Sequence, residues 1–294
     1  MKKIIIICIF TLISAVLYGQ SNLNLKGTYS PTNCNGLISA RDAAFHNDTC
    51  YLISGDGRKV LMAKSNGTPL TSNFSNIIFN QALNIYVDDT YVLVLDWDNL
   101  RFYTKSGVTK YSIPTSSERY QYFWVKNKQE IMLVADNKIS IYNYSTRALI
   151  KSYTPPYRFT SNGNNSEYFT NDGVKLYDFG SKFYSYEYRG GTLQSNNLTT
   201  TKYKTLKEEQ NYLACFVGNE SLWFNYFDRS KAFFVDSGFN VVRNCNSFLP
   251  ASKNPTSDDL YNESGDPNLK VYYSQGKIYV INILPTKVEF YMLE

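Results

Sequence analysis

The chain has 294 residues, and 30 Lys and Arg against 25 Asp and Glu give it a formal net charge of +5. These charges are spread along the chain, whereas proteins that bind nucleic acids concentrate basic residues in a patch, so we expect no nucleic-acid partner. Tyr and Phe are abundant, at 26 and 18 residues, and both types favour β-strands. The length allows one large all-β domain, and no linker rich in Pro, Gly and Ser divides it.

The N-terminal segment predicts a signal peptide. Two lysines precede an apolar run over residues 4–16, and small or polar residues follow it, which is the order of regions in a secretory signal. As a helix this run spans about 20 Å, which is too short for a hydrocarbon core of about 30 Å. We therefore predict a signal peptide over residues 1–19 and a mature domain over residues 20–294. We expect the mature protein to be exported to the periplasm or the cell exterior, without membrane insertion.

Turn signals recur along the mature domain at intervals of about 40 residues. Each turn signal follows a short run of strand-forming residues. One residue marks the position of each signal: Ser65, Ser106, Ser145, Gly190 and Ser237. A period near 40 with several strands in each unit is typical of the blades of a β-propeller. The sequence therefore predicts a single all-β propeller.

Strands can be assigned to about six blades. Four strands fit in each of the units 43–74, 82–114, 122–155, 166–199 and 212–248. In the second unit, residues 91–95 are nearly all apolar, as in a strand buried on both faces. The C-terminal unit supplies three strands and no fourth. We expect residues 23–29 to pair with residues 287–293, which completes the sixth four-stranded blade and closes the ring without an exposed sheet edge.

Two segments resemble the repeats of NHL-type propellers. In residues 93–102 (LVLDWDNLRF) and 133–139 (LVADNKI), an apolar strand ends in Asp, and a turn Asn and a basic residue follow. This resemblance implies a six-bladed propeller of the exported bacterial type, and it indicates no activity because such propellers host many functions. We interpret the recurring aspartates as turn residues whose carboxylates accept hydrogen bonds from nearby N–H groups.

Catalytic motifs are absent from the sequence. The chain has one histidine, His46, beside the first turn of the first unit, and a Ser/His/Asp or Cys/His arrangement would have to use it. The patterns G-x-S-x-G, H-E-x-x-H and C-x-x-C do not occur. We assign no catalytic residue and no metal ligand, and we interpret His46 as an ordinary strand residue.

The cysteines indicate an oxidising compartment. Four remain after removal of the signal peptide, at Cys34, Cys50, Cys215 and Cys245, and an even number in an exported protein favours disulfides. Proximity in sequence suggests Cys34 with Cys50 and Cys215 with Cys245. However, innermost and outermost strands of one blade lie about 14 Å apart, beyond the reach of a disulfide. Cys34 and Cys245 occupy matching positions after outermost strands, so the pairing stays open.

Polar and aromatic residues lie at the start of the predicted innermost strands, at the mouth of the central channel, where propellers bind ligands. We predict a ligand-binding site from Asp42, Asn84, Tyr120, Tyr122, Glu167 and Tyr212. Loop aromatics of this kind can stack on sugars or contact a protein. The sequence therefore favours an exported binding or scaffold protein, without a cofactor, whose partner is a protein or glycan in the cell envelope or outside the cell.

The alternative is a metal-dependent lyase or hydrolase with its site at the same channel mouth. Propeller lactonases and lyases hold a divalent metal there with carboxylate and amide oxygens. Asp42, Asn84 and Glu167 provide such oxygens, and a hard cation such as calcium prefers them. Because no enzyme motif supports this alternative, we favour the binding protein.

Overall fold

The structure is a computed structural model of the chain. It describes residues 21–29, and residues 40–154 apart from positions 117, 119, 121, 127 and 136. Beyond residue 154 it describes residues 167–169, 175–178, 184–189, 192–197, 202, 205, 206, 211–217, 220–225, 231–236, 238–246, 268–274, 277–283 and 287–294. The predicted signal peptide lies outside these residues. In the part that is described, no helix has the length and hydropathy of a membrane span.

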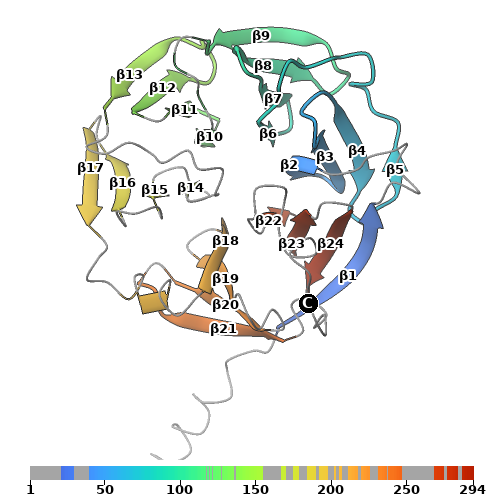
Figure 1. Ribbon diagram of the computed structural model, residues 1–294, viewed down its shortest axis with the longest axis vertical. Helices are drawn as coiled ribbons and strands as arrows, with labels where there is room; N and C mark the ends of the chain where they lie inside the picture. Colours follow the sequence, from blue (N-terminus) through green and yellow to red (C-terminus); the bar gives the residue numbers. More distant parts are fainter. Residues whose placement is uncertain are drawn as a thin grey trace, which may run out of the picture.

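Small antiparallel sheets surround a central axis, as Figure 1 shows. The first sheet contains β2 (Ala40–His46), β3 (Thr49–Ser54), β4 (Val60–Lys64) and β5 (Pro69–Leu70). The second contains β6 (Asn84–Val87), β7 (Tyr91–Leu95), β8 (Asn99–Thr104) and β9 (Thr109–Pro114). The third contains β10 (Tyr122–Lys126), β11 (Glu130–Ala135), β12 (Lys138–Asn143) and β13 (Leu149–Tyr153). The fourth contains β14 (Glu167–Phe169), β15 (Lys175–Asp178), β16 (Tyr184–Arg189) and β17 (Thr192–Asn197).

The remaining strands form one eight-stranded sheet. In spatial order it contains β18 (Asn211–Val217), β19 (Glu220–Asn225), β20 (Lys231–Val235), β21 (Val241–Asn246), β1 (Ser21–Tyr29), β24 (Val288–Leu293), β23 (Lys277–Ile283) and β22 (Asn268–Ser274). The described strands therefore form five sheets, and the prediction of six separate blades is wrong. The reason is that β1 bonds on both sides, through two parallel residue pairs with β21 and six antiparallel pairs with β24.

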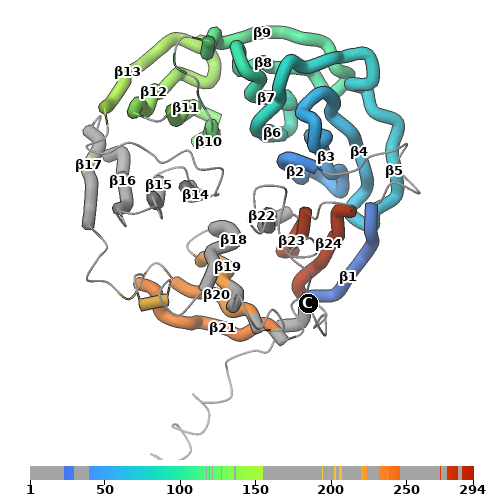
Figure 2. Tube along the Cα trace, in the orientation of Figure 1, coloured from blue at the N-terminus to red at the C-terminus, as the bar shows by residue number. Residues whose placement is uncertain are grey.

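The pairing of β1 with β24 closes the ring and confirms the predicted contact between the two ends of the chain. Its register runs from Leu23 opposite Leu293 to Tyr29 opposite Val288. Figure 2 shows the blue β1 beside the red β24. Leu23 and Tyr29 are buried, so β1 contributes apolar side chains to the core as well as backbone hydrogen bonds.

The core lies between neighbouring sheets. Ile53 of the first sheet and Val94 of the second belong to one cluster of buried residues. Phe74 and Phe79, from the segment that joins these sheets, contact Tyr103 edge-on, with ring centroids 5.5 and 5.9 Å from its own. Because each Å² of apolar surface removed from water contributes about 25 cal/mol, this packing between sheets is a large favourable contribution to stability.

The second sheet has the buried strand and the turn that its sequence predicts. Residues 92–95 of β7 are fully buried, as expected for a strand covered on both faces. Asp96 directly follows this strand, and its Oδ1 accepts a hydrogen bond from the backbone N–H of Trp97 at 2.9 Å. The interpretation of Asp96 as a turn residue is therefore confirmed.

The described cysteines do not form the disulfides that the sequence suggested. Cys50 and Cys245 are free thiols in two separate core clusters, where a thiol packs like a small apolar side chain. Burial raises the pKa of the Cys50 thiol above its usual range, and raises that of Cys245 to about 12. Cys34 and the side chain of Cys215 lie outside the described residues.

Gly27 provides a direct test of ring closure. A Cβ added there would overlap the backbone carbonyl group of Asn66, in the turn that follows β4. Because overpacking costs about 1–3 kcal/mol, we expect Gly27→Ala to lower the free energy of unfolding by about 2 kcal/mol, measured by chemical denaturation. Leu25→Ala is the matched control, because the Leu25 side chain on the same strand is 54% exposed. Equal stability of the two variants would contradict the tight contact of β1 with the first sheet.

Candidate functional site

Two of the residues predicted for the channel mouth lie together. Asn84 Nδ2 donates to Asp42 Oδ2 at 2.5 Å, and the Ile85 N–H donates to the same oxygen at 2.9 Å. The Asn84 Oδ1 in turn accepts a bond from the Phe123 N–H at 3.4 Å. This chain of hydrogen bonds links the innermost strands β2, β6 and β10. Asp42 is only 3% exposed, so its observed contribution is to hold neighbouring sheets together, and a ligand-binding role for it stays a prediction.

The other predicted residues are distributed differently. Tyr120 is buried between sheets, and its hydroxyl donates to Ser140 Oγ at 2.7 Å. Tyr122 is half-buried and packs against the core of the third sheet. Glu167 begins β14 and Tyr212 lies near the start of β18, but their side chains are outside the described part. The structure therefore brings Asp42 and Asn84 together and places Tyr120 in the core.

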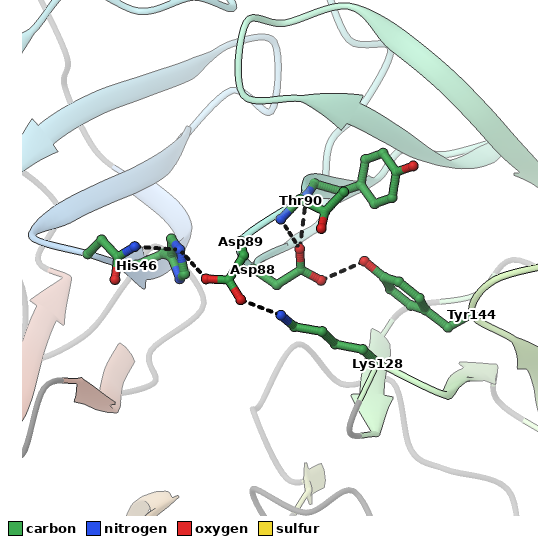
Figure 3. A network of polar contacts seen from close by, with 8 residues as sticks. His46, Asp88, Asp89, Thr90, Lys128 and Tyr144 are labelled. Atoms are coloured by element: carbon green, nitrogen blue, oxygen red, sulfur yellow. Dashed lines mark hydrogen bonds and ion pairs between the residues drawn. The ribbon is translucent and has the colours of Figure 1, made fainter.

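The other end of the innermost strands carries a second set of polar residues, which we call the turn network. It comprises His46, Asp88, Asp89, Lys105, Lys128 and Tyr144. Figure 3 shows His46, Asp89 and Lys128 converging from three neighbouring sheets. Each of these three lies at the turn between the first and second strands of its sheet. Residues in matching turns of successive sheets meet because the sheets are arranged around one axis.

Local sequence explains the turn that presents His46. The two residues after it, Asn47 and Asp48, have positive φ angles of 45° and 62°. A two-residue hairpin turn with positive φ at both positions matches the twist of the adjoining strands, and Asn and Asp tolerate this conformation well. The turn joins β2 to β3 and leaves the imidazole at its edge.

Asp89 connects the three turns. Its Oδ1 lies 3.2 Å from His46 Nε2, and its Oδ2 lies 2.5 Å from Lys128 Nζ. The hydrogen bond from Lys128 holds the pKa of Asp89 below its usual value, and raises the pKa of Lys128. The side chains of Asp89 and Lys128 are 69% and 45% exposed, and ion pairs exposed to this degree add little to stability. Both charges are therefore accessible from solvent while being held in a defined arrangement.

Asp88 stabilises the turn between β6 and β7 from its buried side. It is 3% exposed, and its Oδ1 accepts bonds from the N–H groups of Thr90 and Tyr91 at 2.7 and 2.9 Å. Its Oδ2 accepts a bond from the hydroxyl of Tyr144, in the third sheet, at 2.5 Å. Burial and this contact raise the pKa of Tyr144 above its usual range. Asp88 thus orders the turn that carries Asp89 and ties it to the next sheet.

Lys105 reaches toward the network from the turn after β8. Its Nζ lies 5.4 Å from the centre of the Tyr51 ring and has no hydrogen-bond acceptor among the described residues. Burial lowers the pKa of Lys105 to about 8, although the charges of Asp88 and Asp89 act in the opposite direction. The positive charge on this face therefore decreases at mildly alkaline pH.

The turn network was not among the sites predicted from the sequence. The signal that could have found it is the recurrence of charged or titratable residues at one repeat position, in the segments FHND, VDDT and KNKQ. The channel-mouth set and the turn network lie at opposite ends of β2 and β6. Among the residues with described side chains, no group of three or more His, Cys, Asp and Glu could hold a metal ion.

Comparison with known proteins supports the fold. No family model and no curated protein matches the sequence. An exported protein of Bacteroides fragilis aligns in structure with a TM-score of 0.56 at 8% identity, over 95% of this chain and 96% of its own. The chain is a β-propeller. A luciferin-regenerating enzyme aligns with a TM-score of 0.55 at 11% identity, over 90% of this propeller and 94% of its own length. At such identities the likeness shows the fold alone.

The single histidine offers a clean test of the turn network. Burial lowers the pKa of His46 below 6.5, and Lys105 lowers it further, whereas Asp89 raises it. We therefore expect an NMR titration of the His46 ring to give a pKa below 6.5 that rises in Lys105→Met and falls in Asp89→Asn. A pKa that neither substitution changes would contradict the arrangement.

The same shift predicts how stability depends on pH. Because the pKa of His46 is lower in the folded than in the unfolded chain, the unfolded chain binds more protons in this range. The stabilising contribution of neutral His46 is complete above pH 6.5 and decreases as the pH falls toward the folded-state pKa. Removing the imidazole in His46→Gln should flatten this part of the pH profile.

Proposed function

We propose that the mature chain is an exported, non-catalytic propeller that binds a protein partner through the turn network. The observation that carries the proposal is that exposed Asp89 pairs with His46 and Lys128 from the two neighbouring sheets. Charges that are already oriented need little reorganisation when a partner binds, and a complementary set of charges steers association and gives specificity. A glycan is the other class of ligand that the sequence favours.

The proposal also includes export of the chain and the type of propeller to which it belongs. The exported protein of Bacteroides fragilis shares the fold, and the N-terminal segment has the layout of a signal peptide. We also propose that the propeller is of NHL type. In support, residues 93–102 show the pattern of such repeats, in which an apolar strand ends in Asp and a turn Asn and a basic residue follow.

The alternative is a metal-dependent lyase or hydrolase with a divalent cation, such as calcium, at the channel mouth. The meeting of Asp42 and Asn84 favours it, because it brings two oxygen-bearing side chains together. A cation would have to replace the bonds that Asp42 Oδ2 accepts from Asn84 and Ile85. The likeness to an enzyme, the luciferin-regenerating protein, concerns the fold.

Charge reversal tests the proposed function. The affinity-tagged chain would be purified from the cells that produce it, and each recovered partner would be measured again as a pure protein. We expect Asp89→Lys to weaken binding at least tenfold, and binding of the wild type to weaken as salt rises. Lys110→Glu on the rim strand β9 is the control and should bind normally. A partner that binds Asp89→Lys and wild type equally would contradict the proposal.

Calcium separates the two functions. The binding function predicts the same melting temperature with and without calcium, because the carboxylate of Asp42 remains bonded to Asn84. The enzyme alternative predicts an increase in melting temperature that Asp42→Ala abolishes. Such an increase would contradict the non-catalytic function.

A further inference from the structure

Trp97 stands apart from the other tryptophans of the chain. It lies in the turn between β7 and β8, and 46% of its surface is exposed. Trp223 is fully buried and Trp124 is half-buried. Because tryptophan is usually well buried, an exposed indole at a turn is not explained by packing between sheets. The turn lies at the far end of β7 from Asp88 and Asp89, so it belongs to the face opposite the turn network.

A buried carboxylate fixes the backbone around Trp97. Asp96 is 1% exposed, and its Oδ1 accepts bonds from the N–H groups of Trp97 at 2.9 Å and Gln81 at 2.7 Å. Its Oδ2 accepts a bond from the N–H of Asn80 at 3.2 Å and lies 3.5 Å from Arg101 Nη1. Three backbone N–H groups therefore converge on one side chain, so the residues that carry them are close neighbours in space. The backbone that carries the indole is therefore held in place before any ligand arrives.

Polar side chains with unused hydrogen-bonding capacity lie around the turn that carries Trp97. The side-chain amides of Asn80 and Gln81 make no hydrogen bond with the described residues, and Asn80 is exposed. The carboxylate of Asp98, the residue after Trp97, lies 3.6 Å from Arg101 Nη2. Each amide offers one acceptor oxygen and two donor hydrogens. The turn thus combines one flat apolar ring with amide and carboxylate groups.

This combination matches a neutral saccharide. A sugar ring has one face of C–H groups that packs on an aromatic ring, and a rim of hydroxyls that donate and accept hydrogen bonds. A protein partner that is recognised by charge is better matched by the turn network, where exposed Asp89 and Lys128 form an ion pair. We propose that Trp97, Asn80 and Gln81 form a saccharide-binding site. It is separate from the turn network and does not depend on the function proposed for that network.

Calorimetric titration of the purified mature chain tests this site. The probes are soluble neutral oligosaccharides of glucose, mannose, galactose, xylose and N-acetylglucosamine. We expect at least one of them to bind, with at least a tenfold loss of affinity in Trp97→Ala and a smaller loss in Trp97→Phe, which keeps an aromatic ring. Asn80→Ala should also weaken binding. The control is Ile78→Ala, which removes a 76% exposed apolar side chain from the same segment and should leave affinity unchanged.

Two results would overturn the site. One is that no oligosaccharide binds the wild type, and the other is that binding persists unchanged in Trp97→Ala. Asp89→Lys changes the turn network on the opposite face and leaves the saccharide site intact. Failure of the saccharide site can therefore be distinguished from failure of the proposed function. Saccharide binding that is lost in Asp89→Lys but retained in Trp97→Ala would assign the sugar to the turn network and contradict a separate site.

Discussion

The hydrogen bonding of β1 with β24 is the constraint on which the rest of the fold depends. It joins residues from the two ends of the described chain, and a ring of sheets is complete only when its first and last elements meet. Without β1, β24 would present an unpaired edge of the kind that invites aggregation. The side chains of Leu23 and Tyr29 add buried apolar surface to this seam. Closure therefore contributes both bonds and packing.

Ring closure also explains why polar residues from separate sheets can meet at fixed distances. At one end of the innermost strands, Asp42 and Asn84 link the first two sheets. At the other end, Asp88 accepts a bond from Tyr144 and links the second sheet to the third. The first link is enclosed. The second lies next to Asp89, whose carboxylate is exposed to solvent. This end of the ring is therefore the accessible, charged face.

Some features were predictable because they depend on local patterns or on one long-range pairing. The apolar run of β7, the turn role of Asp96 and the partner of β1 are of this kind. The number of sheets was not, because two residue pairs between β1 and β21 merge eight strands into one sheet. The disulfide prediction used cysteine count and compartment, which do not report that Cys50 and Cys245 pack inside separate clusters. Residue type likewise suggested that Tyr120 lies in a site, although the chain buries it.

The turn network was missed because it depends on how neighbouring sheets are placed rather than on any one segment. His46 has no motif around it, and its partner Asp89 is 43 residues away. Trp97 was part of the NHL-type pattern, but that pattern does not indicate that 46% of its surface is exposed, or that Asp96 binds the N–H groups of residues 80 and 81. His46 and Trp97 were therefore predictable as residues at turns, whereas their chemistry depends on contacts between segments that are distant in the sequence.

The most direct test of ring closure is amide hydrogen exchange of β1 in the mature protein. If β1 is an integral strand, the amides of residues 23–29 exchange only through cooperative unfolding, with protection equal to that of the buried strand β11. Exchange of β1 at the rate of a loose terminal segment, while β11 remains protected, would contradict the claim that this strand closes the ring.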